Sequence, residues 1–331
     1  MFTSRKLAHV VLAMFALVLM SASALAADPG QQYPVRSEAS DQKAGSLLVY
    51  NFYTSTPGVN NRNTRVSMTN TNPFKPAWVH LFFISETCAV ADYKTDLTPN
   101  QTFSFLVSDY DPGFSGYIIA LTENPVNGLP ARFNHLIGDE YFKSAIGDAN
   151  LGAVAFTANW GDNDYDLFTG GYNDGPTITV QFDGINGYSR AAATVAADNI
   201  PSAQDLNSTT IILNSLRGAL TSVMGPVGTM FGLMYDDVEI SYSFSISVGC
   251  HTRVTLSDTT PRTTPRFTTI VPAGRTGWIK LYSNAGNAVV GAMVNRNPNT
   301  ESRPDVFNGG HNLHHLTLST NGSLTIPVFP Q

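Results

Sequence analysis

The chain has 331 residues, of which only 13% are charged, and its formal net charge is −6 at pH 7. This acidic balance provides no basic field for nucleic acid, which we exclude as a partner. Few charges and frequent turn residues, including 27 glycines and 19 prolines, are typical of an exported all-β protein.

The first 26 residues have the organisation of a secretory signal peptide. Arg5 and Lys6 form a basic segment, an apolar run covers residues 10–20, and residues 24–26 read Ala-Leu-Ala, a small-x-small cleavage site. The apolar run is shorter than the ~20 residues that a membrane-spanning helix needs, and no later run is longer. We expect cleavage after Ala26, export to the periplasm, cell surface or medium, and no transmembrane segment in the mature chain.

The mature chain is predicted to begin with a flexible leader and a first β unit. Residues 27–44 are polar and form the leader. The first unit, residues 45–195, opens with a strong strand signal at 45–53 and contains a buried strand at 78–84. Residues 139–158 are the best helix candidate, although two glycines weaken the pattern. We therefore expect a β-sandwich with a helical insertion.

An acidic segment follows the helix candidate, with the sequence Trp-Gly-Asp-Asn-Asp-Tyr-Asp at residues 160–166. The carboxylates of Asp162, Asp164 and Asp166 have a spacing that can converge on Ca²⁺ when the backbone curls around the ion. The segment does not match an EF-hand loop, so a solvated acidic loop is the alternative. Calcium is the only cofactor that the sequence suggests.

Three aromatic residues lie in the same region, near turn glycines: Trp160, Tyr165 and Tyr172. Exposed rings of this kind can stack on sugars, so these residues are candidates for a ligand-binding surface. Packing in the core or in a turn is the alternative use of them.

A second β unit is predicted at residues 196–331, with the boundary falling between Asp183 and Asn214. Apolar and polar residues alternate from Val238 to Val248, which is the clearest period-two signal in the chain. This alternation predicts a long, half-buried strand.

Residues 261–282 read as two strand segments joined by a turn at residues 272–277. A shorter version of this pattern occurs at residues 113–118, and it aligns Gly116 with Gly277. The echo suggests that the two β units are an internal repeat; two unrelated hairpins are the alternative.

Cys88 and Cys250 are the two cysteines of the chain. An even number of cysteines in an exported protein leaves a disulfide open. Each cysteine precedes one copy of the echoed pattern, so a true repeat would place them at equivalent positions, which usually lie far apart. Two buried thiols are the alternative.

Three histidines, His311, His314 and His315, follow a Gly-Gly pair near the C-terminus. The alternating apolar and hydroxyl residues after them predict a strand, on which His314 faces the core and His315 faces outward. On a continuous strand His311 and His315 are roughly 13 Å apart at ~3.3 Å per residue, too far for one metal ion. We therefore expect no zinc site here.

Three segments resemble a group of exported bacterial proteins of unknown function: Gly45–Asn51, Asn63–Phe83 and Phe307–Leu318. This resemblance covers most of the mature chain and implies no activity or catalytic residue. Asn63–Phe83 is also similar to the accessory immunoglobulin-like modules of bacterial surface proteins, a likeness of fold only.

The sequence contains no local catalytic motif, and we assign no residue a catalytic role. We predict an all-β fold of two immunoglobulin-like β-sandwich units with one or two short helices. The expected function is structural or adhesive, with glycans or surface proteins as candidate partners. A carbohydrate- or ligand-binding module and a hydrolase without a local motif are the alternatives.

Overall fold

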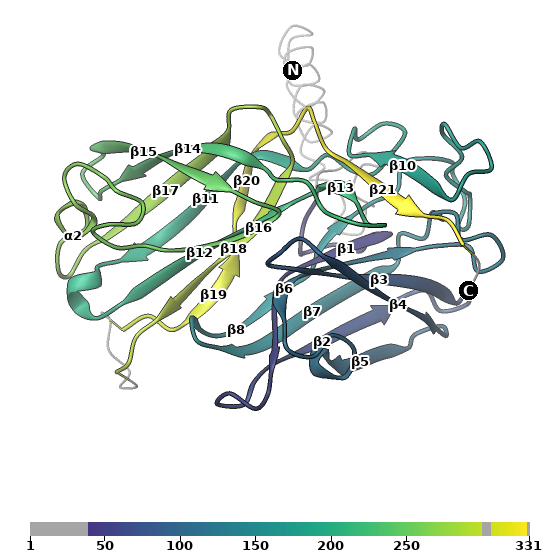
Figure 1. The fold of residues 1–331 in the computed structure, drawn as a ribbon, viewed down its shortest axis with the longest axis horizontal. Helices are drawn as coiled ribbons and strands as arrows, with labels where there is room; N and C mark the ends of the chain where they lie inside the picture. The colour runs from purple at the N-terminus through teal and green to yellow at the C-terminus, as the bar shows by residue number, and fades with distance from the viewer. Residues whose placement is uncertain (1–38, 300–305, 330–331) are drawn as a thin grey trace, which may run out of the picture. The chain divides into compact units, whose positions relative to one another are not determined.

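The computed structural model describes residues 39–299 and 306–329, so the predicted signal peptide lies outside the described residues. Nearly all of the regular secondary structure in the described chain is strand, in two 9-stranded sheets and one 3-stranded sheet, with one short α-helix (Figure 1). None of its helices is long and apolar enough to cross a membrane. The prediction of an all-β fold with two sandwich-like units is confirmed.

The first unit is a 9-stranded sheet that bends into two layers. Its strand β1 belongs to both layers, because most of β1 pairs with β6 and β9 while its last two residues pair with β2. A β-bulge between Tyr50 and Tyr53 lies close to where β1 changes partner, as expected for a strand that bends. The strands are β1 (Leu47–Thr56), β2 (Arg62–Asn70), β3 (Ala77–Ser85), β4 (Val90–Leu97), β5 (Thr102–Leu106), β6 (Ser115–Thr122), β7 (Leu136–Ser144), β8 (Gly147–Gly152) and β9 (Val154–Phe156), with a 3-10 turn, η1 (Val107–Asp109), before β6.

The helix predicted at residues 139–158 is wrong, because this segment forms part of β7 and the whole of β8 and β9. β7 and β8 pair from Ser144–Gly147 to Asp139–Gly152. Gly147 adopts φ +132° in the tight connection, a conformation that side-chain-bearing residues rarely adopt. Buried and exposed side chains alternate along both strands, and this period of two decides the structure.

The second unit repeats the topology of the first. The strand order β4-β3-β6-β1 of the first sheet corresponds to β15-β14-β17-β11 in the second. Every pairing of the first sheet except β1–β2 has a counterpart in the second. The strands are β11 (Ala192–Pro201), β12 (Ser208–Ser215), β14 (Gly228–Tyr235), β15 (Ser241–Val248), β16 (His251–Thr255), β17 (Thr276–Ser283), β18 (Val289–Arg296), β19 (Gly309–Asn312) and β20 (His314–Leu318), with a second 3-10 turn, η2 (Ala203–Asp205), and the helix α2 (Phe267–Ile270).

The sequence pattern that aligns Gly116 with Gly277 corresponds to a structural repeat. Gly116 pairs with Tyr53 beside the bulge of β1, and Gly277 pairs with Ile200 beside a bulge of β11. At both glycines a Cβ atom would approach a backbone carbonyl oxygen of the neighbouring strand to 2.5 Å or less. The aligned glycines therefore allow close approach of strands at the same point of each unit.

Two strand predictions in the second unit are wrong, one for a whole segment and one for the residue at which a strand begins. Residues 267–270 form α2 instead of a strand, because the Asp258 side chain accepts hydrogen bonds from Thr268, while two apolar residues of this single turn are buried. The strand predicted to begin at Val238 begins at Ser241. The carboxylate of Asp236 accepts the N–H groups of Val238 and Ile240 there and forms a turn.

A 3-stranded sheet joins the two units. It consists of β10 (Thr177–Gln181), β21 (Ser323–Pro327) and β13 (Arg217–Ala219). Strand β21 comes from the C-terminal end of the chain and returns to pair with β10, while β11 spans the predicted boundary between residues 195 and 196. The apolar side chains of this small sheet share a core with the outer face of the first unit; they are Ile178, Val180, Leu324 and Ile326, against Leu47, Val49, Phe82, Ile84, Tyr117, Ile119 and Leu121.

The two units also meet through the bulge of β1. Phe52 packs in a cluster with Phe142 of the first unit and Ile212 and Ala292 of the second. The Asn51 side chain donates hydrogen bonds to the carbonyl of Gly291 and to Asn312. This junction is buried, so the units form one body instead of two modules on a linker.

Cys88 and Cys250 form a disulfide, with their Cα atoms 5.8 Å apart. They do not occupy equivalent positions in the repeat: Cys88 lies between β3 and β4, whereas Cys250 lies between β15 and β16. Their non-equivalence is what allows them to meet, because turns from different places in each repeat face each other across the junction. The pairing that the sequence left open is therefore a covalent link between the units.

The last part of the predicted flexible leader is not a free tail. Ser40 forms an antiparallel bridge with Ala155 of β9, through hydrogen bonds in both directions. Ala39 is buried beside it. Residues 39–44 of the predicted leader therefore lie against the first unit.

Candidate functional site

The acidic segment gives its three carboxylates separate partners. Asp164 pairs with Lys75 and His135, both at 3.0 Å. Although partial burial opposes the shift, hydrogen bonds from these two residues hold the pKa of Asp164 below its usual value. The Asp166 carboxylate accepts the backbone N–H groups of residues 162 and 163, and Asp162 is exposed. The three residues proposed for calcium thus contact different groups and do not converge.

The three aromatic residues proposed for ligand binding pack against the protein. Trp160 is only 8% exposed and its Nε1 donates to the carbonyl of Asp166. Tyr165 stacks on Phe133, with ring centroids 5.4 Å apart, and its hydroxyl donates to a backbone carbonyl. Tyr172 packs at the edge of the core between the units. These rings therefore do not form an open platform.

A different aromatic surface exists on the second unit, on the outward face of β14 and β17. We call it the aromatic face and define it by Phe231, Leu233, Tyr235, Trp278, Lys280 and Tyr282, which point away from the core formed by Met230, Met234, Ile279 and Leu281.

Strand register places these side chains in cross-strand pairs. Tyr235 is opposite Trp278, and their rings stack with centroids 4.2 Å apart and an interplanar angle of 5°. Phe231 is opposite Tyr282, with centroids 5.1 Å apart. The neighbouring strand β15 presents a row of serines beside them, Ser241, Ser243, Ser245 and Ser247. The face therefore combines apolar rings, hydroxyl groups and one lysine.

The aromatic face is absent from the predictions above, although the sequence contains a signal for it. In β17 the aromatic residues Trp278 and Tyr282 alternate with the buried Ile279 and Leu281. Aromatic residues at the outward positions of a half-buried strand are candidates for binding. Only the structure shows which of the two faces is covered.

The histidines near the C-terminus do not lie on one continuous strand, and the expectation that they diverge is wrong for two of them. β19 ends at Asn312 and β20 begins at His314, and Leu313 between them is buried in the core of the second unit. This break brings the His311 and His314 rings together, with centroids 5.7 Å apart. The predicted facing is also reversed: His314 is exposed, whereas His315 lies on the other side of the strand, where burial lowers its pKa.

Two buried ionisable groups lie at the junction of the units. Burial raises the pKa of Glu140, whose carboxylate accepts the N–H of Phe52. Burial, helped by the nearby Arg253, lowers the pKa of His251 to about 3. The His251 ring is within 2.7 Å of the Asn214 side chain and stacks with Phe52 and Tyr117. These groups are enclosed by packing, so their role is structural.

Comparisons with protein-family models, with curated proteins and with solved structures give no match for this chain.

Proposed function

We propose that this chain is an exported, non-catalytic double β-sandwich protein with an adhesive role at the cell surface or in the periplasm, acting through the aromatic face of the second unit. One observation carries the proposal. The same face in the first unit is buried under the 3-stranded sheet, whereas in the second unit it carries stacked rings and is open, with Trp278 36% exposed. The surfaces through which proteins bind one another are enriched in aromatic side chains of this kind.

The rigid connection between the two units supports an adhesive role. A disulfide between Cys88 and Cys250 joins the units, and disulfides persist in oxidising compartments outside the cytosol. The shared core and the polar contacts of Asn51 hold the aromatic face in a fixed position relative to the first unit. A rigid surface loses less conformational entropy on binding than a mobile one.

The resemblance to exported bacterial proteins agrees with this proposal and adds no activity to it. The candidate partners are surface proteins or glycans. The groups on the aromatic face are rings, hydroxyls and a lysine, a set suited to contact and hydrogen bonding.

A carbohydrate-binding function is the second candidate. It is favoured by the serine row of β15 beside the Tyr235 and Trp278 rings. Aromatic rings provide apolar surface for the C–H groups of a sugar, and adjacent hydroxyls can bond its oxygens. The same residues serve both candidates, so ligand identity separates them.

The test uses beads coated with the mature protein and measures their attachment to bacterial cells, together with binding of the same protein to a glycan array. The double variant Tyr235→Ala/Trp278→Ala should lose attachment. The control Phe74→Ala removes a ring that is 86% exposed elsewhere on the surface and should attach normally. Saturable glycan binding that is lost in the double variant would favour the carbohydrate candidate. Attachment and glycan binding that are both absent, or unaffected by the double variant, would refute the proposal.

A further inference from the structure

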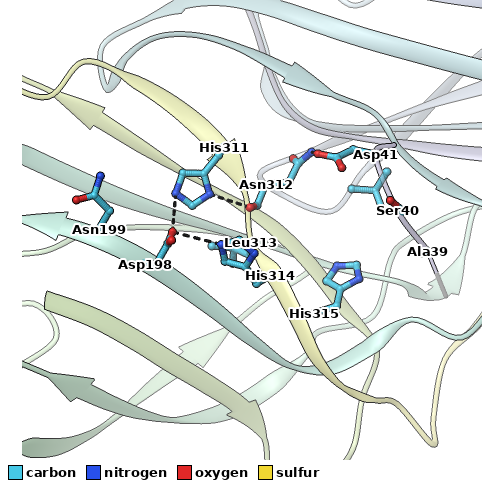
Figure 2. Close-up of a pocket in the computed structure, with 11 residues that line it drawn as sticks. Ala39, Ser40, Asp41, Asp198, Asn199, His311, Asn312, Leu313, His314 and His315 are labelled. Carbon is cyan, nitrogen blue, oxygen red and sulfur yellow. Dashed lines mark hydrogen bonds and ion pairs between the residues drawn. The ribbon is translucent and has the colours of Figure 1, made fainter. Parts of the chain in front are cut away.

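We propose that Asp198, His311 and His314 form a binding site for a divalent transition metal ion, and we commit to zinc. One carboxylate oxygen and one ring nitrogen from each histidine all lie within 4.8 Å of one another. In the part of the chain that the structure describes, no other group of three Asp, Glu, His or Cys side chains brings its ligand atoms this close together. Figure 2 shows both imidazole rings directed at the Asp198 carboxylate.

The two distances from the carboxylate to the histidine nitrogens fit a single ion. Asp198 Oδ1 is 3.3 Å from His311 Nε2 and 3.3 Å from His314 Nε2. Ligands at ~2.0–2.1 Å from a tetrahedral zinc ion are about 3.3 Å from one another. Little movement is therefore needed to place an ion between these three atoms.

The hydrogen bonding of His311 prepares its Nε2 atom for a metal. Its Nδ1 lies 2.9 Å from the carbonyl oxygen of Asn312. A carbonyl only accepts, so Nδ1 must carry a proton, and in the neutral ring the lone pair is then on Nε2. This is the arrangement by which a second partner fixes the tautomer of a metal-binding histidine.

The Nε2 atom of His311 has no hydrogen-bond partner among the described residues and is shielded from solvent. It faces Asp198 Oδ1, which is close enough for an ion pair, but the two atoms do not have the geometry of a hydrogen bond. A lone pair facing a carboxylate is repulsive unless a cation or a proton lies between them. A metal ion satisfies both groups at once.

Two irregularities of the fold create the site. The bulge of β11 between Ala197 and Ile200 sets Asp198 and Asn199 out of the regular pairing. The buried Leu313 separates β19, which pairs with β18, from β20, which pairs with β11. The two histidines flank this break and therefore reach Asp198 from the same side.

The surroundings leave room for a further ligand. The site opens into a cavity of about 590 Å³, lined also by Ser40, Asp41 and Asn199 (Figure 2). Two imidazoles and one carboxylate, without sulfur, suit zinc, and three protein ligands leave the fourth position for water or another molecule. The site is distinct from the aromatic face, and neither proposal depends on the other.

The test is equilibrium dialysis of the tag-free mature protein against zinc chloride, followed by elemental analysis. We expect one zinc ion per chain. His311→Ala/His314→Ala should abolish binding, and Asp198→Asn should weaken it roughly tenfold or more, because even groups that only orient a ligand contribute ~10–100-fold to metal affinity. His135→Ala, which removes a histidine paired with Asp164, is the matched control and should bind like wild type.

Thermal unfolding without zinc checks that the variants fold. The side chains of Asp198, His311 and His314 are 61%, 38% and 56% exposed, so their replacement should change the midpoint little. Wild-type protein that binds no zinc, or a double histidine variant that binds it as tightly as wild type, would overturn the proposal. If Asp198→Asn bound zinc as tightly as wild type, the carboxylate would not be a ligand, and the three-ligand assignment would be overturned.

Discussion

The two units of this protein have the same strand topology and opposite environments on one face. In the first unit, Tyr117 and Ile119 of β6 point outward and are completely buried, because the 3-stranded sheet and the second unit cover them. The equivalent positions of β17, Trp278 and Lys280, face solvent. The same backbone plan therefore supports a core in one copy and a surface in the other, and the difference lies in what covers each face.

The bulges of the two long strands show the same contrast. Asn51 in the bulge of β1 is fully buried and bonded to the second unit. Asp198 in the equivalent bulge of β11 is exposed and faces two histidines. β-Bulges often redirect side chains at functional sites. The covered copy uses its bulge for assembly, and the open copy has its bulge side chain available for a ligand.

The largest expected effect concerns the covalent link between the units. Cys88 and Cys250 are 162 residues apart in sequence, and closing a loop of this length restricts the unfolded chain by about 5 kcal/mol in the chain-entropy account. Cys88→Ala/Cys250→Ala should lower the free energy of unfolding by about that amount in urea denaturation. Wild-type protein with reductant should approach the variant, and the variant itself should not respond to reductant. Free thiols in denatured, non-reduced wild type would contradict the link.

Equivalent aromatic residues of the two units should differ in their contribution to stability. Tyr117 is fully buried and its hydroxyl donates to the carbonyl of Ser215, so Tyr117→Ala should cost about 3–5 kcal/mol. Trp278→Ala removes one exposed cross-strand pair and should cost about 1 kcal/mol or less. Urea denaturation of both variants measures the difference. Equal costs would show that the outward face of the second unit is also covered.

The next effect is a dependence of stability on pH that comes from His251 at the junction of the units. His251 begins β16 and is buried with a pKa of about 3, whereas the equivalent strand β5 begins with the exposed Thr102. The unfolded chain has a histidine pKa near 6.5 and so binds more protons than the folded chain below that pH. Stability should therefore fall as pH decreases from about 6.5 towards 3, by about 2 kcal/mol between pH 7 and pH 5.

The control for this effect is His251→Phe, which keeps a stacked ring and cannot be protonated. It should be less stable than wild type at pH 7, because the Asn214 Oδ1 atom loses its bond to the His251 ring, and the difference should shrink as pH falls to 5. Burial also lowers the pKa of the half-buried His315, so the variant should retain part of the pH dependence. A difference that is constant with pH would show that His251 is not the group responsible.

The sequence predicted local structure better than the arrangement of the strands. Continuous apolar runs located β1 and β3, whose two faces are both buried, and a period-two pattern located most of β15, which buries one face. The pattern at residues 139–158 was misread as a helix, because the hairpin at Gly147 places apolar residues at mixed spacings. The outward face of β6 is covered by β10 and β21, which are distant in the sequence, and the outward face of β17 has no such cover; no local pattern records that difference.

The metal-site residues show the same limit. A regular strand would place His311 and His314 on opposite faces, so the sequence predicts that their side chains diverge. The structure breaks the strand at Leu313, since this residue joins the core of the second unit. Asp198, which completes the group, is more than a hundred residues away in sequence and carries no signal of its own.

The smallest expected effect separates the two bulges. Asn51→Ala should cost about 1–2 kcal/mol, because the side chains of Asn312 and Asn214, which both bond to the Asn51 side chain inside the protein, lose a partner. Asp198→Asn should change the free energy of unfolding by no more than about 0.5 kcal/mol in zinc-free buffer, since the side chain is exposed and its neighbours can bond to water. The measurement is urea denaturation of both variants with chelator present. Asp198→Asn could instead lower the free energy of unfolding as much as Asn51→Ala. The Asp198 carboxylate would then stabilise the fold through the two histidines, and the two bulges would not differ in the way described here.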